Sequence, residues 1–192
     1  MNVTPSAQEQ ARIRQILTGD VGQYAYFVER YQHDVLTFIC RLGVGQADAE
    51  ELAQDTFVRA FRGLTAFEGK SSFRTWLLRI AHRTALNHLG RAHPATVSID
   101  DDSPRAVQAC VAADYATALD ADSDAALSTG REERIQLLEA AILKLPPDDQ
   151  LLLRLFYFEN QPLADIAYIL DTSAGALSGR LHRIRKRLRR EL

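Results

Sequence analysis

The stretch Leu163–Leu192 reads LADIAYILDTSAGALSGRLHRIRKRLRREL and joins a short apolar segment, a tight turn and a longer basic segment. Apolar residues recur three and four positions apart in both segments, which predicts two helices. A short helix, a turn and a longer helix form the pattern of a helix-turn-helix motif, whose second helix enters the major groove of DNA. The stretch therefore predicts a C-terminal helix-turn-helix domain.

The turn between these two predicted helices reads LDTS and contains Asp171. Such turns often need a left-handed backbone, which Asp adopts less readily than Gly but more readily than a β-branched residue. Thr172 or Ser173 follows, and either side chain can accept a hydrogen bond from a free backbone amide of the next helix. We therefore expect a left-handed residue at Asp171 and a cap at Thr172 or Ser173.

The last predicted helix carries two parallel stripes of side chains. The apolar stripe, which we expect to pack inward, consists of Ala174, Leu177, Leu181, Ile184 and Leu188. The cationic stripe is rotated by about 100° around the helix axis and consists of Arg180, Arg183, Arg187 and Arg190. A basic run alone is equally compatible with a solvated face. The preceding short helix and turn favour DNA, because the planar guanidinium donates paired hydrogen bonds to phosphate or guanine.

Upstream, residues 7–90 follow a helical pattern that breaks near 19–22, 43–46 and 63–72. Three of the predicted helices carry apolar stripes that would close a small bundle. The stripes consist of Tyr24, Phe27, Val28, Tyr31, Val35, Phe38 and Ile39; of Ala49, Leu52, Ala53, Phe57 and Ala60; and of Phe73, Leu77, Ile80, Ala81 and Thr84. Since no convincing strand pattern occurs, the sequence predicts an all-α chain.

Residues 97–130 carry seven Asp and one Arg, and their hydrophobic periodicity fades. This composition is typical of a flexible acidic linker. We therefore expect two small helical domains, an N-terminal bundle over residues 5–92 and a C-terminal helix-turn-helix domain over 131–192, joined by a linker over 93–130.

Composition excludes several classes of protein. Of 192 residues 46% are hydrophobic, which is enough for the chain to bury a core. The net charge is -2. Cys40 and Cys110 are too few for a disulfide scaffold and lack zinc-site spacing, which favours a cytoplasmic setting. No apolar run is long enough to cross a membrane, so we expect no membrane insertion. His33 and Asp34 lack the further ligands of a metal phosphohydrolase, and we expect no catalysis, metal or cofactor.

A second basic element lies at residues 70–91, which contain five Lys or Arg and no acidic residue. The aromatic residues Phe73 and Trp76 interrupt the charges. Cations hold phosphates while aromatic rings stack on unpaired bases, so the combination is typical of a single-strand site. For Trp76 the alternative of a core aromatic is at least as good, because Trp76 lies beside the apolar stripe.

Two segments resemble a known family. The segment LPPDDQLLLRLFYFENQPLADIAYILDTSAGALSGRLHRIRKRLRREL, Leu145–Leu192, is similar to the -35-reading domain of extracytoplasmic-function (ECF) sigma factors. The segment DAEELAQDTFVRAFRGLTAFEGKSSFRTWLLRIAHRTALNHLGR, Asp48–Arg91, is similar to the polymerase-binding helix and the -10 element of the same family. Arg83 departs from the pattern, which commonly has Asn there. Ala176, Ser178 and Gly179 depart likewise, where Thr, Lys and Ser are common.

The resemblance implies a role for each group of residues. The -10 contacts would come from Lys70, Ser71, Phe73, Arg74, Trp76, Arg79, Arg83 and Asn87. The -35 contacts would come from Ser173, Ser178, Arg180, Arg183 and Arg187. A surface for the polymerase would consist of Asp48, Glu50, Glu51 and Asp55, although any one of these carboxylates could simply favour a helix N-terminus.

The resemblance also implies partners. They are RNA polymerase core, through the clamp of its largest subunit and the flap of its second-largest subunit, promoter DNA, and an anti-sigma factor. The acidic triplet Asp100–Asp102 is either a solvated part of the linker or an occupant of a basic polymerase channel. The chief alternative function is an autonomous helix-turn-helix regulator, which would bind duplex DNA without polymerase.

Overall fold

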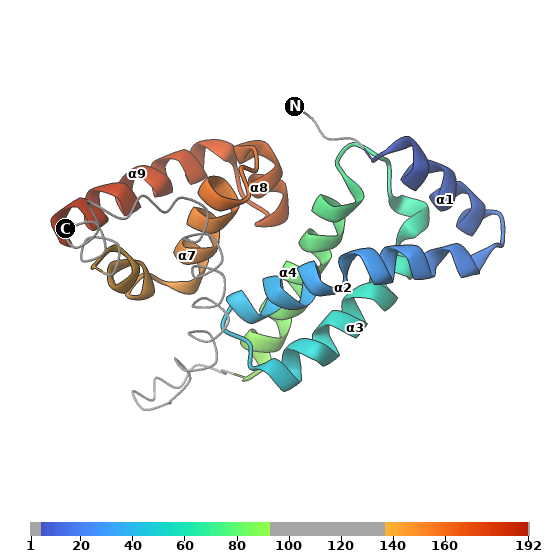
Figure 1. Ribbon diagram of the computed structural model, residues 1–192, viewed down its shortest axis with the longest axis horizontal. Helices are drawn as coiled ribbons and strands as arrows, with labels where there is room; N and C mark the ends of the chain where they lie inside the picture. Colours follow the sequence, from blue (N-terminus) through green and yellow to red (C-terminus); the bar gives the residue numbers. More distant parts are fainter. Residues whose placement is uncertain (1–4, 93–136, 192) are drawn as a thin grey trace, which may run out of the picture.

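The computed structural model describes residues 5–92 and 137–191, and within these ranges every regular element is helical (Figure 1). The chain forms two helical domains, as the sequence predicts. The whole of the expected linker over residues 93–130, and with it the acidic triplet Asp100–Asp102 and Cys110, lies outside the described residues.

The N-terminal domain is a bundle in which helices α2, α3 and α4 pack against one another. Its core contains Phe27, Val35, Ala49 and Phe73, none of which is exposed to solvent. The predicted breaks at 19–22, 43–46 and 63–72 all separate helices, so the predicted order is confirmed. The elements are α1 (Ala7–Leu17), η1 (Val21–Tyr24), α2 (Ala25–Arg41), α3 (Gln46–Arg62), η2 (Leu64–Ala66) and α4 (Phe73–Ala92).

Local hydrogen bonds fix where two of these helices begin. At α1 the Ser6 hydroxyl accepts a hydrogen bond from the Glu9 amide at 3.2 Å, and the Glu9 carboxylate accepts one from the Ser6 amide at 2.9 Å. This reciprocal capping box satisfies two amides that lack a partner within the helix. At α4 the Ser72 hydroxyl accepts from the Thr75 amide at 3.0 Å. Helix α4 therefore starts at a defined residue, which fixes the direction of its basic side chains.

The C-terminal domain begins, within the described residues, with a helical segment at 137–143. It continues with α7 (Pro147–Leu153), η3 (Arg154–Phe158), α8 (Leu163–Ile169) and α9 (Ala174–Glu191). Element η3 is a π-helical turn, in which the Glu159 amide donates to the Arg154 carbonyl at 3.1 Å. A π-turn inserts one residue into a helix and shifts the register of everything that follows.

The turn between α8 and α9 has the predicted geometry. Asp171 adopts a φ of 55°, in the left-handed region. The Ser173 hydroxyl accepts a hydrogen bond from the Ala176 amide at 3.1 Å, which confirms a cap at one of the two expected positions. Leu177, Leu181 and Ile184 are buried. Ala174, which we expected in the same stripe, is exposed and is the first residue of α9.

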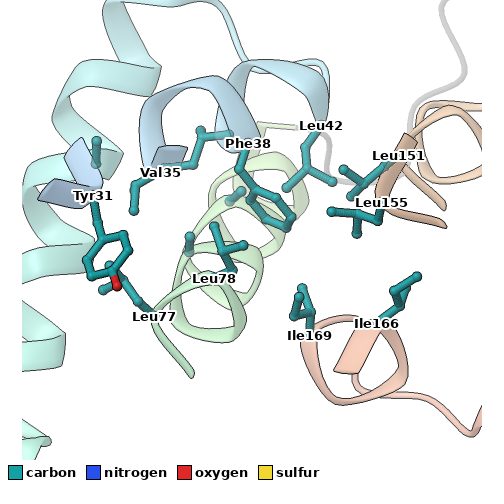
Figure 2. Packing of buried hydrophobic residues seen from close by; sticks show 14 of the residues in the cluster. Tyr31, Val35, Phe38, Leu42, Leu77, Leu78, Leu151, Leu155, Ile166 and Ile169 are labelled. Carbon is teal, nitrogen blue, oxygen red and sulfur yellow. The ribbon is translucent and has the colours of Figure 1, made fainter. Parts of the chain in front are cut away.

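The two domains contact each other along α4 and α8. Figure 2 shows Phe38 of α2, and Leu42 directly after this helix, directed toward Leu151 and Leu155 of the C-terminal domain, with Leu78 of α4 close by. All five side chains belong to one cluster of buried residues. Apolar side chains therefore join the N-terminal bundle to the C-terminal domain.

Candidate nucleic-acid interface

Helix α4 separates apolar and basic side chains onto different faces. Phe73, Leu77 and Ala81 are completely buried in the bundle. Arg83 and Asn87 are exposed, and Arg79 is 26% exposed at its side chain. Because Arg79, Arg83 and Asn87 are four residues apart in sequence, they form one row along the outer face of α4.

The loop before α4 carries an aromatic cluster. The Phe67 ring lies 5.0 Å from the Trp76 ring and 5.7 Å from the Phe73 ring, measured between centroids. Trp76 is half-buried, so it supports the loop while part of its side chain stays accessible. Phe73 is wholly buried, with its ring centroid 4.2 Å from that of Phe27, so it has no exposed surface in this structure and its expected direct contact with DNA stays a prediction.

Two further expected -10 residues lie in the loop itself. Lys70 is exposed and forms an ion pair with Glu68. Ser71 is half-buried, and its hydroxyl donates to the Ser72 carbonyl at 3.3 Å. Gly69 lies between Glu68 and Lys70, and its left-handed backbone, with a φ of 70°, turns the chain there. The loop thus presents one cation next to the start of α4.

The three α4 arginines expected to hold DNA all pair with carboxylates of the C-terminal domain. Arg79 and Arg83 reach the two oxygens of Asp171 at 2.6 and 3.0 Å. Arg74 reaches Glu159 at 2.9 Å, and it also reaches Asp34 within its own domain at 2.6 Å. The hydrogen bond from Arg83, with the charge of Arg79, holds the pKa of Asp171 below its ordinary value.

His82 is a buried ionisable group on α4. Its side chain lies beside the Phe38 ring, and its Nδ1 has no hydrogen-bond partner. Burial lowers the pKa of His82 below its ordinary value, and the charges of Asp148 and Asp171 oppose the shift only in part. His82 therefore favours its neutral form in this structure.

The acidic residues expected to contact the polymerase lie on α3. Asp48, Glu50 and Glu51 are exposed on the first turns of the helix. Asp48 lies 3.6 Å from His88 of α4, and Asp55 pairs with Arg59 one turn further along at 2.8 Å. The first three carboxylates thus form an open acidic surface, whereas a neighbouring arginine offsets the charge of Asp55.

Helix α9 carries the residues expected to read the -35 element. Arg183, Arg187 and Ser178 are exposed. Arg180 instead forms ion pairs with Asp149 and Asp148 of α7, the latter at 3.7 Å, and its side chain is 32% exposed. Ser173 is exposed but its hydroxyl caps the helix. The structure therefore assigns Arg180 a part in holding α9 against α7.

Sequence patterns did not indicate that Glu159, Tyr168 and Asp171 face α4. The Arg79 guanidinium lies 4.3 Å from the centroid of the Tyr168 ring. Each of these contacts joins residues far apart in sequence, so no helical spacing announces them. The only signal was the acidic residue at the left-handed turn position, where Gly fits best.

Within residues 5–92 and 137–191, no group of three His, Cys, Asp or Glu side chains is arranged to hold a metal ion. Among the same residues, no helix combines the length and the hydropathy needed to cross a lipid bilayer.

Comparison with other proteins places both domains in one family. Residues 27–94 match the family model for Sigma-70 region 2, and residues 135–188 match the one for Sigma-70 region 4. The RNA polymerase sigma-H factor of Pseudomonas aeruginosa is 31% identical over 188 residues, which cover 96% of this chain and 94% of the relative. The ECF RNA polymerase sigma-E factor of Escherichia coli K12 is 31% identical over 181 residues, with coverage of 93% and 91%.

Two solved structures share the fold. CnrH, determined in complex with the cytosolic domain of CnrY, has a TM-score of 0.58 at 20% identity, covering 93% of this chain and 92% of that one. The sigma factor RpoE, determined with the anti-sigma factor NepR from Bartonella quintana, has a TM-score of 0.53 at 19% identity, with coverage of 88% and 95%. With 31% identity to sigma factors over nearly its whole length, the chain belongs to the ECF group of sigma-70 RNA polymerase sigma factors.

Proposed function

We propose that this sigma factor contacts the -10 element with α4 and its preceding loop, and the -35 element with α9. The proposal divides the chain into region 2 at 5–92, a linker at 93–130 and region 4 at 131–192. One observation carries it: α4 buries its apolar edge in the bundle and projects Arg79, Arg83 and Asn87 from one outer face. The chain has no catalysis of its own and acts in the cytoplasm, where the polymerase supplies the chemistry.

At the -10 element the arginines of α4 would hold phosphates of the non-template strand. The partly exposed Trp76 ring lies at the start of the same helix and would offer a stacking surface for an unpaired base. Opening a base step costs a few kcal/mol, and capture of an extruded base offsets part of that cost. Phe73 contributes by supporting the Phe67 and Trp76 rings from within the core.

At the -35 element α9 would enter the major groove, with Arg183 and Arg187 as its principal cations. Ser178 lies nearer the start of the helix and can donate to a phosphate or a base edge. Since Arg180 is paired with Asp149, it would orient α9 and contact DNA less directly than its position in the cationic stripe implies.

The exposed carboxylates Asp48, Glu50 and Glu51 would meet the clamp of the largest polymerase subunit, with Asp55 at the edge of this surface. Region 4 would meet the flap of the second-largest subunit. Opposite charges across such an interface raise the association rate more than the affinity. Replacing both Glu50 and Glu51 with Gln should therefore slow association with the core, whereas Glu29→Gln on the exposed side of α2 is the matched control.

Control by an anti-sigma factor is part of the proposal. Two proteins of the same fold, CnrH and RpoE, were determined with CnrY and the anti-sigma factor NepR, respectively. A partner that clamps both domains would keep the chain from the polymerase. The acidic linker would serve either as a solvated tether or as an occupant of a basic channel.

Run-off transcription tests the proposal directly. Purified chain and core polymerase are incubated with a library of promoter fragments, and the transcripts are sequenced. We expect initiation that requires both proteins, and the Arg79→Ala/Arg83→Ala variant should still bind core but yield far fewer open complexes. Specific duplex binding with no core-dependent transcript from any fragment would instead support an autonomous regulator.

A further inference from the structure

Carboxylates of the C-terminal domain pair with three arginines of the α4 surface that the proposed function assigns to -10 DNA. Asp171 accepts hydrogen bonds from Arg79 and Arg83 with its two separate oxygens. Glu159 accepts from Arg74 at 2.9 Å and from Arg41 of α2 at 3.3 Å. A carboxylate that bridges two guanidinium groups uses the same donors that a phosphate would use. Carboxylates thus occupy the cations that DNA would need.

The ion pairs lie beside an apolar contact. Leu78 of α4 and Ile166 and Ile169 of α8 are almost completely buried, and they belong to one cluster that spans both domains. The Tyr168 ring packs on the Arg79 guanidinium. A cation on an aromatic face is attracted to the ring, so Arg79 is held from two sides. The contact between domains is therefore both apolar and charged.

The backbone at Asp171 provides independent support. Its left-handed φ of 55° is a conformation that Gly adopts without strain and that other residues adopt at a cost. A Gly at this position would close the same turn but would provide no carboxylate for Arg79 and Arg83. The carboxylate of Asp171 is thus not needed for the turn, and what it adds is the pairing with Arg79 and Arg83.

We infer that region 4 is an intramolecular competitor of -10 DNA, with Asp171 and Glu159 occupying the arginines of α4 in a closed chain. This inference rests on the proposed function, because it takes α4 as the -10 surface. In the closed chain the -10 strand and region 4 exclude each other. The open chain, in which region 4 has moved away to its own DNA element, exposes Arg74, Arg79 and Arg83 together.

The test measures binding of the full-length chain, without polymerase, to a fluorescein-labelled single-stranded DNA of mixed sequence. The apparent affinity for the strand is the affinity of the open chain multiplied by the fraction of molecules that are open. Weakening the closed form therefore tightens apparent binding. We expect Asp171→Asn to bind about tenfold more tightly than the wild type. Asn tolerates the left-handed backbone, so the turn should be retained, and Asp171→Gly should behave in the same way.

A matched control separates this effect from a general change in charge. Glu191→Gln removes one negative charge from the same domain, where Glu191 pairs only with Lys144 at 3.3 Å among the described ion pairs. It should change the affinity by less than about twofold. Equal gains in Asp171→Asn and Glu191→Gln would overturn the inference.

A double-mutant cycle locates the effect on α4. In an Arg79→Ala/Arg83→Ala background, Asp171→Asn should have little effect, because the arginines that it releases are absent. A full gain in that background would overturn the inference. If Arg79→Ala/Arg83→Ala weakens strand binding but Asp171→Asn has no effect, region 4 is no competitor and the proposed -10 surface stands. If the Asp171→Asn chain binds equally with and without these arginines, the proposed -10 surface itself is wrong.

Discussion

Helices α4 and α9 both place arginines beside an apolar stripe, and the structure gives the two rows different surroundings. On α4, Arg74, Arg79 and Arg83 all pair with carboxylates of the other domain. On α9, Arg183 and Arg187 are exposed, while Arg180 pairs within its own domain. A row of arginines in the sequence therefore indicates that a helix can bind phosphate, but the packing of the domains decides whether those arginines are free to do so.

The buried edge of α4 gives the largest expected effect. Phe73→Ala removes an aromatic side chain from a fully buried site and should lower the free energy of unfolding by about 3–5 kcal/mol. Urea unfolding followed by circular dichroism measures this loss. Phe61→Ala is the matched control, since Phe61 is 39% exposed and its main aromatic partner is Tyr24, so we expect a cost of about 1 kcal/mol. Similar losses in both variants would contradict the buried placement of Phe73.

The next effect concerns DNA binding, for which Arg187 of α9 is exposed and Arg83 of α4 is ion-paired. Arg187→Ala should lower the slope of log affinity against log salt by about 1 for a short mixed-sequence duplex, because one phosphate contact is lost. Arg83→Ala should leave that slope unchanged while Asp171 occupies Arg83. Fluorescence anisotropy over a salt series provides both slopes. Equal decreases in the two variants would show that both rows are equally available.

His82 gives the smallest expected effect. Because burial lowers its pKa below the ordinary value of 6.5, the folded chain binds fewer protons at this site than the unfolded chain. The contribution of neutral His82 to the free energy of unfolding is complete above pH 6.5, and it is lost as the pH falls through the lowered pKa. Denaturant titrations between pH 7.5 and 5 should show a decline that His82→Leu reduces.

Exposed His182 on α9 provides the control for this titration. His182→Gln should retain the decline in stability seen in the wild type. An unchanged decline in His82→Leu would assign the pH dependence to other groups.

The sequence predicts much of the fold because helix breaks and apolar stripes are local signals. The left-handed Asp171 and the Ser173 cap are likewise local, and both were expected from residue type. The placement of Phe73 could not be decided in this way, because an aromatic between basic residues suits a stacking site as well as a core. Arg180 was expected on the DNA face, and only the approach of α7 brings Asp149 to it.

Contacts between the domains were the least predictable part of the site. Arg79 and Asp171 are separated by 92 positions, and most of the residues between the domains carry no helical periodicity. Pairing over such a distance depends on how two folded domains pack together. The spacing of residues within either domain does not predict that packing. The row of arginines on α4 was therefore predictable, but its carboxylate partners were not.

The π-helical turn Arg154–Phe158 has a consequence for how this chain could change over evolutionary time. A regular α-helix through the same segment would contain one residue fewer, and each residue rotates a helix by about 100°. Glu159 follows the turn directly, so a single-codon deletion there would point its carboxylate away from Arg74 and Arg41. Insertion or loss of one residue in this turn is thus a short mutational route to a chain that lacks the Glu159 ion pairs between its two domains.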